Sequence, residues 1–74
     1  MAAIYSVQDL GALVRTERKA QGYTQTELAQ ICKVSLSFIS NLEQGKNTSE
    51  MGKALHVIQM LGVDLTWKKR GADL

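Results

Sequence analysis

The fold is decided by residues 24–45, TQTELAQICKVSLSFISNLEQG. Thr24 and Glu27 have the spacing of a capping box, in which each side chain bonds the backbone amide of the other, so a helix is predicted to begin here. Ser35 is a good N-cap for a second helix, and Gly45 supplies its C-terminal stop. The turn between the two helices is short, so the helices must cross sharply. This layout is that of a helix-turn-helix, which in DNA-binding proteins places its second helix in the major groove.

The second predicted helix presents short side chains on its outward face. Leu36, Ser37, Ser40 and Asn41 lie there, where a soluble protein usually shows Lys and Glu. Short side chains approach base edges closely, and an Asn amide pairs with adenine through two hydrogen bonds. The pattern therefore favours DNA binding. An ordinary pair of antiparallel helices with a surface of low charge is the alternative.

Length and composition allow one small globular domain. The chain has 74 residues, of which 45% are hydrophobic and 22% are charged, and it contains no proline. A core of this size is thin, so oligomerisation would add stability. Residues 1–10 lack the basic region of a secretory signal, and no apolar run is long enough to span a membrane. The single cysteine, Cys32, excludes an intrachain disulfide and suits a reducing compartment, so we expect a cytoplasmic protein associated with the bacterial nucleoid.

The charge balance gives only weak support for a nucleic-acid partner. The formal net charge is +2, and a strongly basic domain would say more. Residues 68–70, Lys-Lys-Arg, form a basic cluster near the end of the chain. This cluster is either a solvated tail or a contact to phosphates or to a partner protein.

Two further helices are predicted around the helix pair. Ser6 can cap a helix that runs to about Gln21. Thr48 or Ser49 is expected to cap a last helix that runs to about Leu61. Apolar residues occur nearly all round this last helix, so we expect it to be buried on two sides, one of them against a second protomer.

Residues 63–68 alternate apolar and polar side chains, which is the pattern of a half-buried strand. Val63, Leu65 and Trp67 form its apolar face. A lone strand has no partner within the chain, so the simplest partner is the same strand from a second copy, related by a two-fold axis. An extended tail that lies on the domain is the alternative.

The sequence shows none of the usual signs of catalysis or metal binding. It has no glycine-rich phosphate loop, no metal-ligand cluster and no nucleophile motif. Its one histidine, His56, lies in the middle of a predicted helix and far in sequence from Cys32. A domain this small also has little room for a pocket. We therefore expect no enzymatic activity, no cofactor and no bound metal.

Taken together, these segments resemble the Xre helix-turn-helix family of phage and bacterial repressors. The resemblance covers about residues 7–62, and its most specific residues are Gln25, Glu27–Ala29, Val34–Ser35, Ile39–Glu43 and Gly45. It implies an all-α fold, a compact four- to five-helix lambda-repressor-like domain that binds double-stranded operator DNA as a homodimer. The whole chain, 1–74, is then one domain with a helical core at 6–62, a dimerisation strand at 63–68 and a mobile tail at 69–74.

The resemblance also implies roles for residues outside the base-reading face. Gln25, at the start of the first hairpin helix, would bond a DNA phosphate. Lys46 and Asn47 would lie in a loop that contacts backbone phosphates. Arg18 and Glu43 would form a partly buried salt bridge between the first helix of the domain and the recognition helix.

The recognition helix follows the family in part. By resemblance, the residues that face or flank the bases are Ser35, Leu36, Ser37, Ser40 and Asn41. Leu36 departs from relatives that carry a long polar reader, since leucine cannot hydrogen-bond a base, although it can touch a thymine methyl group. Phe38 departs as well, because this position is often small and polar; its ring either packs toward the first helix or crowds the DNA backbone.

A narrower resemblance is to HipB-like antitoxins. It rests on the small size, on the Thr-Gln-x-Glu-Leu-Ala and Ile-Ser-Asn-x-Glu segments, and on a last helix that runs straight into a short strand. In that group the C-terminal strand pairs across the dimer. The dimer represses its own type II toxin–antitoxin operon and holds a HipA-like serine/threonine kinase toxin. Two alternatives stay open, namely a stand-alone repressor without a toxin partner and a protein-interaction module that has lost DNA binding.

Overall fold

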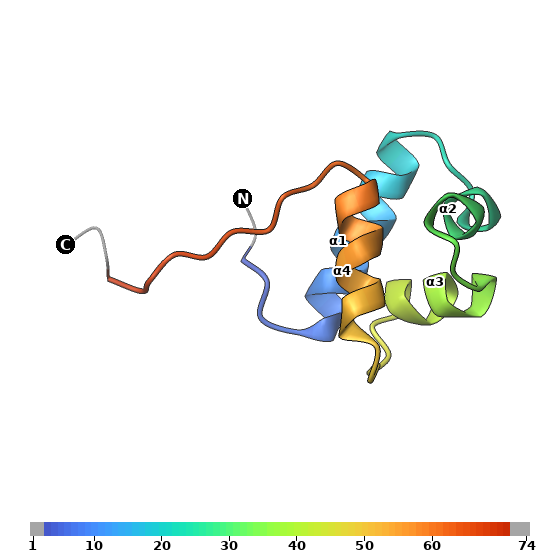
Figure 1. The fold of residues 1–74 in the computed structure, drawn as a ribbon. Helices are drawn as coiled ribbons and strands as arrows, with labels where there is room; N and C mark the ends of the chain where they lie inside the picture. The colour runs from blue at the N-terminus through green and yellow to red at the C-terminus, as the bar shows by residue number, and fades with distance from the viewer. Residues whose placement is uncertain (1–2, 72–74) are drawn as a thin grey trace.

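The domain is built from four helices, as a computed structural model of residues 3–71 shows (Figure 1). Their bounds are α1 Val7–Ala20, α2 Gln25–Cys32, α3 Leu36–Glu43 and α4 Met51–Met60. α1 and α4 lie one behind the other on one side of the domain, and the α2–α3 hairpin lies on the other side (Figure 1). No strand occurs among residues 3–71, so the described chain is all-α, as predicted.

The first three helices begin at the capping residues that the sequence predicts. The Ser6 hydroxyl accepts a hydrogen bond from the Asp9 amide at 3.1 Å. Both bonds of the capping box are present at α2, where the Thr24 hydroxyl accepts from the Glu27 amide and the Glu27 carboxylate accepts from the Thr24 amide. At α3 the Ser35 hydroxyl accepts from the amide three residues later, at 3.0 Å. These side chains satisfy amide groups that an isolated helix start leaves unpaired.

The fourth helix begins differently from the prediction. Its N-cap is Glu50, whose side chain makes no capping hydrogen bond, so the expectation of Thr48 or Ser49 as the cap is wrong. The physical reason is local. The Thr48 hydroxyl accepts a hydrogen bond from the Glu50 amide at 2.9 Å and so forms a local turn. Because this bond lies before the helix, the hydroxyl does not cap the first turn of α4.

The core lies where α1, the hairpin and α4 meet. Its buried apolar residues are Leu10, Val14, Leu28, Ala29, Cys32, Ile39, Leu42, Ala54, Val57, Ile58 and Leu61. α1 and α3 cross closely at Gly11, since a Cβ atom there would collide with the Leu42 carbonyl oxygen. A side chain at this position would therefore separate the two helices.

The turn between α2 and α3 carries local strain. Lys33 adopts a left-handed conformation with φ of 58°, which costs a residue that has a Cβ atom about 1–2 kcal/mol. The Val34 amide donates to the Ala29 carbonyl at 3.0 Å, which closes the end of α2. This geometry lets the two helices cross with so few residues between them.

Residues 63–71 extend away from the body, on the side of α1 and α4 opposite the hairpin (Figure 1). Val63 packs against the core, whereas Leu65 is half exposed and Trp67 is 88% exposed. The expected strand at 63–68 is not formed in this single chain, which offers it no second edge, so pairing with another copy stays a prediction. Residues 72–74, the end of the expected mobile tail, lie outside the described residues.

Among residues 3–71, no helix is both long and apolar enough to cross a lipid bilayer.

Candidate nucleic-acid interface

The outward face of α3 is exposed and carries almost no charge. Leu36 is 48% exposed at the start of the helix, Ser37 follows it and is exposed, and Asn41 is exposed about one turn after Ser37. None of these three side chains is used in packing against the core. A helix surface of this kind allows close approach to base edges, with Asn41 able to donate and accept at once.

Ser35 and Ser40 lie beside this face but have other partners. Ser35 caps α3, so its hydroxyl oxygen already accepts one hydrogen bond. The Ser40 hydroxyl is half-buried and accepts from the Gln44 side-chain amide at 3.0 Å. Each hydroxyl keeps a hydrogen to donate. Both are therefore placed at the edge of the candidate interface rather than at its centre.

Phe38 does not project with the polar residues. It is half-buried, packs against the core and has the Lys53 ammonium 5.9 Å from its ring centroid. This contact between α3 and α4 is a cation–π interaction at an exposed site. The large ring therefore does not crowd the outward face of α3.

The loop after α3 continues the candidate interface. Lys46 and Asn47 are exposed, and together with Asn41 they line a common hollow next to Phe38. The Lys46 amide also donates to the Asn41 carbonyl at 3.0 Å, which fixes the loop to the end of the helix. The structure thus brings the predicted base reader Asn41 together with the two residues predicted to contact phosphates.

A buried ion pair ties α1 to the end of α3. Arg18 Nε donates to Glu43 Oε2 at 2.7 Å, and Arg18 Nη2 donates to Glu43 Oε1 at 3.0 Å. The side chains are 11% and 4% exposed, respectively. The remaining arm of the guanidinium donates to the Tyr23 carbonyl at 2.8 Å. A two-point pair with a third bond to the backbone is the geometry that guanidinium groups favour.

Gln25 belongs to the same network. Its side-chain Nε2 donates to Glu43 Oε1 at 3.1 Å, so this residue, predicted to contact a phosphate, is held at the start of α2 by the end of α3. No buried side-chain nitrogen or oxygen among the described residues lacks a hydrogen-bond partner.

The charge state of the pair follows from its surroundings. Burial acts to raise the pKa of Glu43, but hydrogen bonds from Arg18 and Gln25 and the charges of Arg18 and Arg15 outweigh it, so the pKa lies below its usual value. The hydrogen bond to Glu43 raises the pKa of Arg18. Both groups are therefore ionised throughout the physiological pH range.

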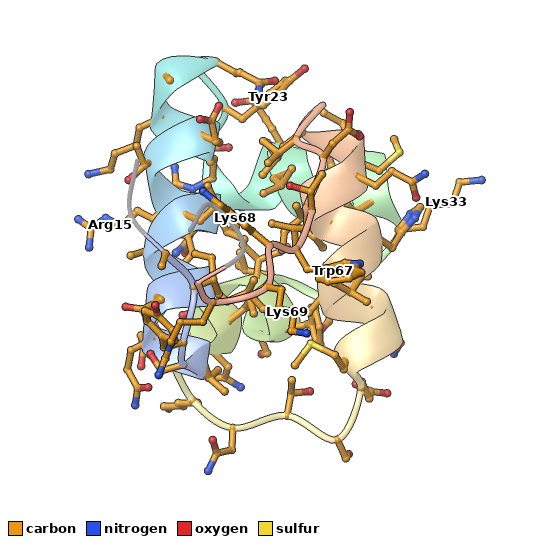
Figure 2. All side chains as sticks on the ribbon, turned by 90° about the vertical axis from the view of Figure 1, so that its left-hand side faces the viewer. Arg15, Tyr23, Lys33, Trp67, Lys68 and Lys69 are labelled. Atoms are coloured by element: carbon orange, nitrogen blue, oxygen red, sulfur yellow. The ribbon has the colours of Figure 1, made fainter. Side chains whose placement is uncertain are left out.

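Two exposed residues of this region were not predicted from the sequence. Gln44 is exposed at the end of α3, and Arg15 is exposed on α1, on the outer side of that helix (Figure 2). Helical spacing was the available signal, because Gln44 lies four residues after Ser40 and Arg15 lies one turn before Arg18. The Gln44 side chain bonds Ser40, and the charge of Arg15 acts on Glu43.

The residues predicted for dimerisation lie apart from this interface. Figure 2, viewed from the side to which residues 63–71 project, shows Trp67 and Lys69 in front of α1 and α4, away from the hairpin. Trp67 therefore does not join the candidate DNA contacts of its own chain.

No cluster of metal-ligating side chains occurs in the part of the chain that the structure describes. Burial raises the pKa of the Cys32 thiol, so this buried group is neutral at physiological pH.

Comparison with known proteins agrees with the geometry. A family model described as helix-turn-helix matches residues 14–68, which is more than half of the chain. The chain belongs to the helix-turn-helix family of DNA-binding transcriptional regulators. An uncharacterized HTH-type transcriptional regulator, y4mF, of Sinorhizobium fredii (strain NBRC 101917 / NGR234) is 51% identical over 57 residues, which cover 77% of this chain and 75% of that protein.

A second relative of the regulator shares only part of its length. The competence pilus inhibition repressor of Acinetobacter baylyi (strain ATCC 33305 / BD413 / ADP1) is 54% identical over 37 residues, which are 50% of this chain and 34% of that protein. The similarity shows that this repressor contains a related helix-turn-helix region.

Solved structures of HipB proteins have the same fold as this helix-turn-helix regulator. A chain in the HipA-HipB-O2-O3 complex superposes with a TM-score of 0.81 at 26% identity, over 93% of this chain and 97% of that one. A chain in the HipB-O4 20mer complex gives the same TM-score, identity and coverage. The resemblance to the Xre family and to HipB-like proteins is therefore confirmed.

Proposed function

We propose that this protein is a sequence-specific transcriptional repressor that binds operator DNA as a homodimer, with α3 in the major groove. The observation that carries the proposal is the exposed, nearly uncharged face of α3, with Asn41 joined at one end to Lys46 and Asn47. Base edges are read by short polar side chains, and phosphates are held by the flanking loop and Gln25. The likeness to a chain in the HipB-O4 20mer complex supports binding to an operator.

The homodimer is proposed from the opposite side of the domain. Leu55 and Met60 on α4 are 48% and 45% exposed, a large apolar exposure for one ten-residue helix. Leu55 and Leu65 also line a hollow at the base of the extended C-terminal segment. A second copy would cover these side chains, and paired segments 63–68 would satisfy each other's backbone groups.

A narrower part of the proposal is that the repressor is the HipB-like antitoxin of a type II toxin–antitoxin operon, located in the bacterial cytoplasm. Its partner would be a HipA-like serine/threonine kinase toxin. The support is the similarity to a chain in the HipA-HipB-O2-O3 complex over nearly its whole length. No catalytic activity, cofactor or metal enters this proposal.

A stand-alone repressor is the second candidate. It is favoured by the two sequence relatives, which are named as a transcriptional regulator and a repressor and not as antitoxins. Copurification of the tagged protein from its native host separates the two candidates. An antitoxin brings down a larger kinase-like protein, whereas recovery of the homodimer alone supports the stand-alone repressor.

The DNA-binding proposal is tested by separating reading from positioning. Asn41→Ala or Ser37→Ala is expected to relax sequence preference at one base pair, by about 1–3 kcal/mol for a good two-bond contact. Gln25→Ala should weaken binding to all sequences alike, because a phosphate contact carries little base information. Binding is measured on the DNA upstream of the protein's own gene and on a DNA fragment of scrambled sequence. Equal losses on both fragments for all three variants would contradict the assignment of α3 as the reading helix.

A further inference from the structure

Glu43 occupies a position that a stabilising ion pair alone does not explain. Its Oε1 atom accepts two hydrogen bonds, one from Arg18 Nη2 at 3.0 Å and one from Gln25 Nε2 at 3.1 Å. The second bond joins residues 18 positions apart, and it fixes the first residue of α2 to the last residue of α3. The Arg18–Glu43 pair would be complete without it.

The chemistry of the carboxylate determines how the Gln25 amide is oriented. An ionised carboxylate accepts hydrogen bonds and donates none. The amide NH₂ group must therefore face Glu43, because the reverse orientation would place two oxygen atoms against each other. One N–H of Nε2 is used in this bond, and the second N–H remains for another acceptor.

The charges around Glu43 permit that acceptor to be an anion. Arg18 neutralises the carboxylate directly, and the exposed Arg15 adds a second positive charge close enough to lower the pKa of Glu43. A phosphate oxygen that approaches Gln25 therefore meets two arginines that offset the carboxylates of Glu43 and Glu27, together with the partial positive charge at the start of α2. The half-buried position of Gln25 also limits the number of conformations that its side chain samples.

We infer that Glu43 is a positioning residue for DNA binding, which holds the Gln25 amide so that one N–H of Nε2 points outward to a backbone phosphate. The inference rests on the proposed function and assigns the ion pair a second role besides stability. The ordering of Gln25 is then complete before DNA arrives, which lowers the entropic cost of the contact.

A double-substitution cycle in the full-length protein tests the inference. Glu43→Gln keeps the shape of the side chain and removes its charge, so the Gln25 amide is no longer held in one orientation. We expect Glu43→Gln to weaken binding to the upstream region, by up to about tenfold if the phosphate bond is lost. In a Gln25→Ala background the same substitution should cause no loss. A structural or electrostatic effect would give equal factors in both backgrounds and would overturn the inference.

Two controls separate positioning from stability and from the proposed function. Ile58→Ala opens a cavity in the core on α4 and is expected to lower the melting midpoint about as much as Glu43→Gln does. It should leave DNA affinity unchanged at a temperature where all variants are folded. Equal factors in both backgrounds, with normal binding by the unaltered protein, overturn the inference alone. Absence of specific binding by the unaltered protein overturns the proposed function as well.

A readout without DNA tests the same contact directly. The side-chain amide of Gln25 should give an NMR order parameter well above that of the exposed Gln30 on the same helix, and Glu43→Gln should remove the difference. Equal mobility of the two amides in the unaltered protein would contradict the inference whether or not DNA binds.

Discussion

The α1–α3 crossing and the α4 side of the domain differ in how completely a single chain buries and hydrogen-bonds their side chains. At the crossing, Arg18 and Glu43 are nearly buried and joined by two hydrogen bonds, and the helices meet without a gap. On the other side, α4 starts without a side-chain cap, Leu55 is 48% exposed and Trp67 is 88% exposed. The difference teaches that one chain completes the α1–α3 crossing by itself, whereas the α4 side leaves apolar side chains exposed, which the proposed homodimer would cover.

The largest expected effect is a loss of stability at the α1–α3 crossing. Arg18→Ala should lower the free energy of unfolding by about 3 kcal/mol, because Glu43 keeps its desolvation cost and loses its counter-charge. Urea unfolding measures the change. Arg15→Ala is the matched control, an exposed arginine one turn away whose loss should cost no more than about 0.5 kcal/mol. Equal unfolding midpoints for the two variants would show that the crossing does not depend on the ion pair.

The close approach of the two helices gives the next prediction. Gly11→Ala should cost about 2 kcal/mol, since the added methyl group collides with the Leu42 carbonyl and must push α3 away from α1. Gly52→Ala on α4 is the control, because a methyl group there meets open space and favours the helix. Thermal melting compares the two. A Gly11→Ala variant as stable as Gly52→Ala would mean that the helices do not pack this tightly.

On the other side, substitution should affect assembly rather than folding. Trp67→Ala is expected to weaken dimerisation by about 2 kcal/mol, the loss typical of a large aromatic anchor at an interface. Thr66→Ala is the control, because its side chain alternates to the opposite face of the extended segment. Sedimentation equilibrium measures the dimer constant. If both variants dimerise like the unaltered protein, the C-terminal segment is not part of the interface.

The smallest effect concerns the turn that joins the two helices of the hairpin. Lys33→Gly should stabilise the fold by about 0.5–1 kcal/mol, since glycine relieves the left-handed strain at a cost in unfolded-chain entropy. Lys46→Gly, at an ordinary backbone conformation, should not stabilise it. Unfolding midpoints decide, and a loss of stability in Lys33→Gly would show that the lysine side chain makes a contact that outweighs the strain.

The sequence predicted the parts of the fold that depend on neighbouring residues. Ser6, Thr24 and Ser35 marked helix starts because a capping hydrogen bond spans only three residues. The start of α4 was misplaced because Thr48 could serve equally well as a cap or as a turn residue, and only the folded loop decides. The left-handed conformation of Lys33 was not predicted either, since a lysine gives no sign of it.

The exposure of the candidate residues on α3 and the Arg18–Glu43 pair were predicted, but the other connection within the candidate site was not. The residues of α3 were found from their exposure pattern, whereas the bond between Gln25 and Glu43 joins two helices and cannot be derived from spacing. The role of residues 63–68 depends on a second chain, so neither the pattern nor a single chain determines it. Packing between helices and between copies is what the sequence alone leaves open.

Footprinting of the DNA upstream of the protein's own gene tests the central claim most directly, because it reports both sequence recognition by α3 and binding as a dimer. Two α3 helices related by a two-fold axis predict a palindromic site with two protected half-sites about one helical turn apart, roughly 34 Å. Protection should weaken steeply as salt is raised, since phosphate contacts release counterions. Uniform, sequence-independent protection, or no protection at low salt, would contradict the account of this domain as a dimeric reader of operator DNA.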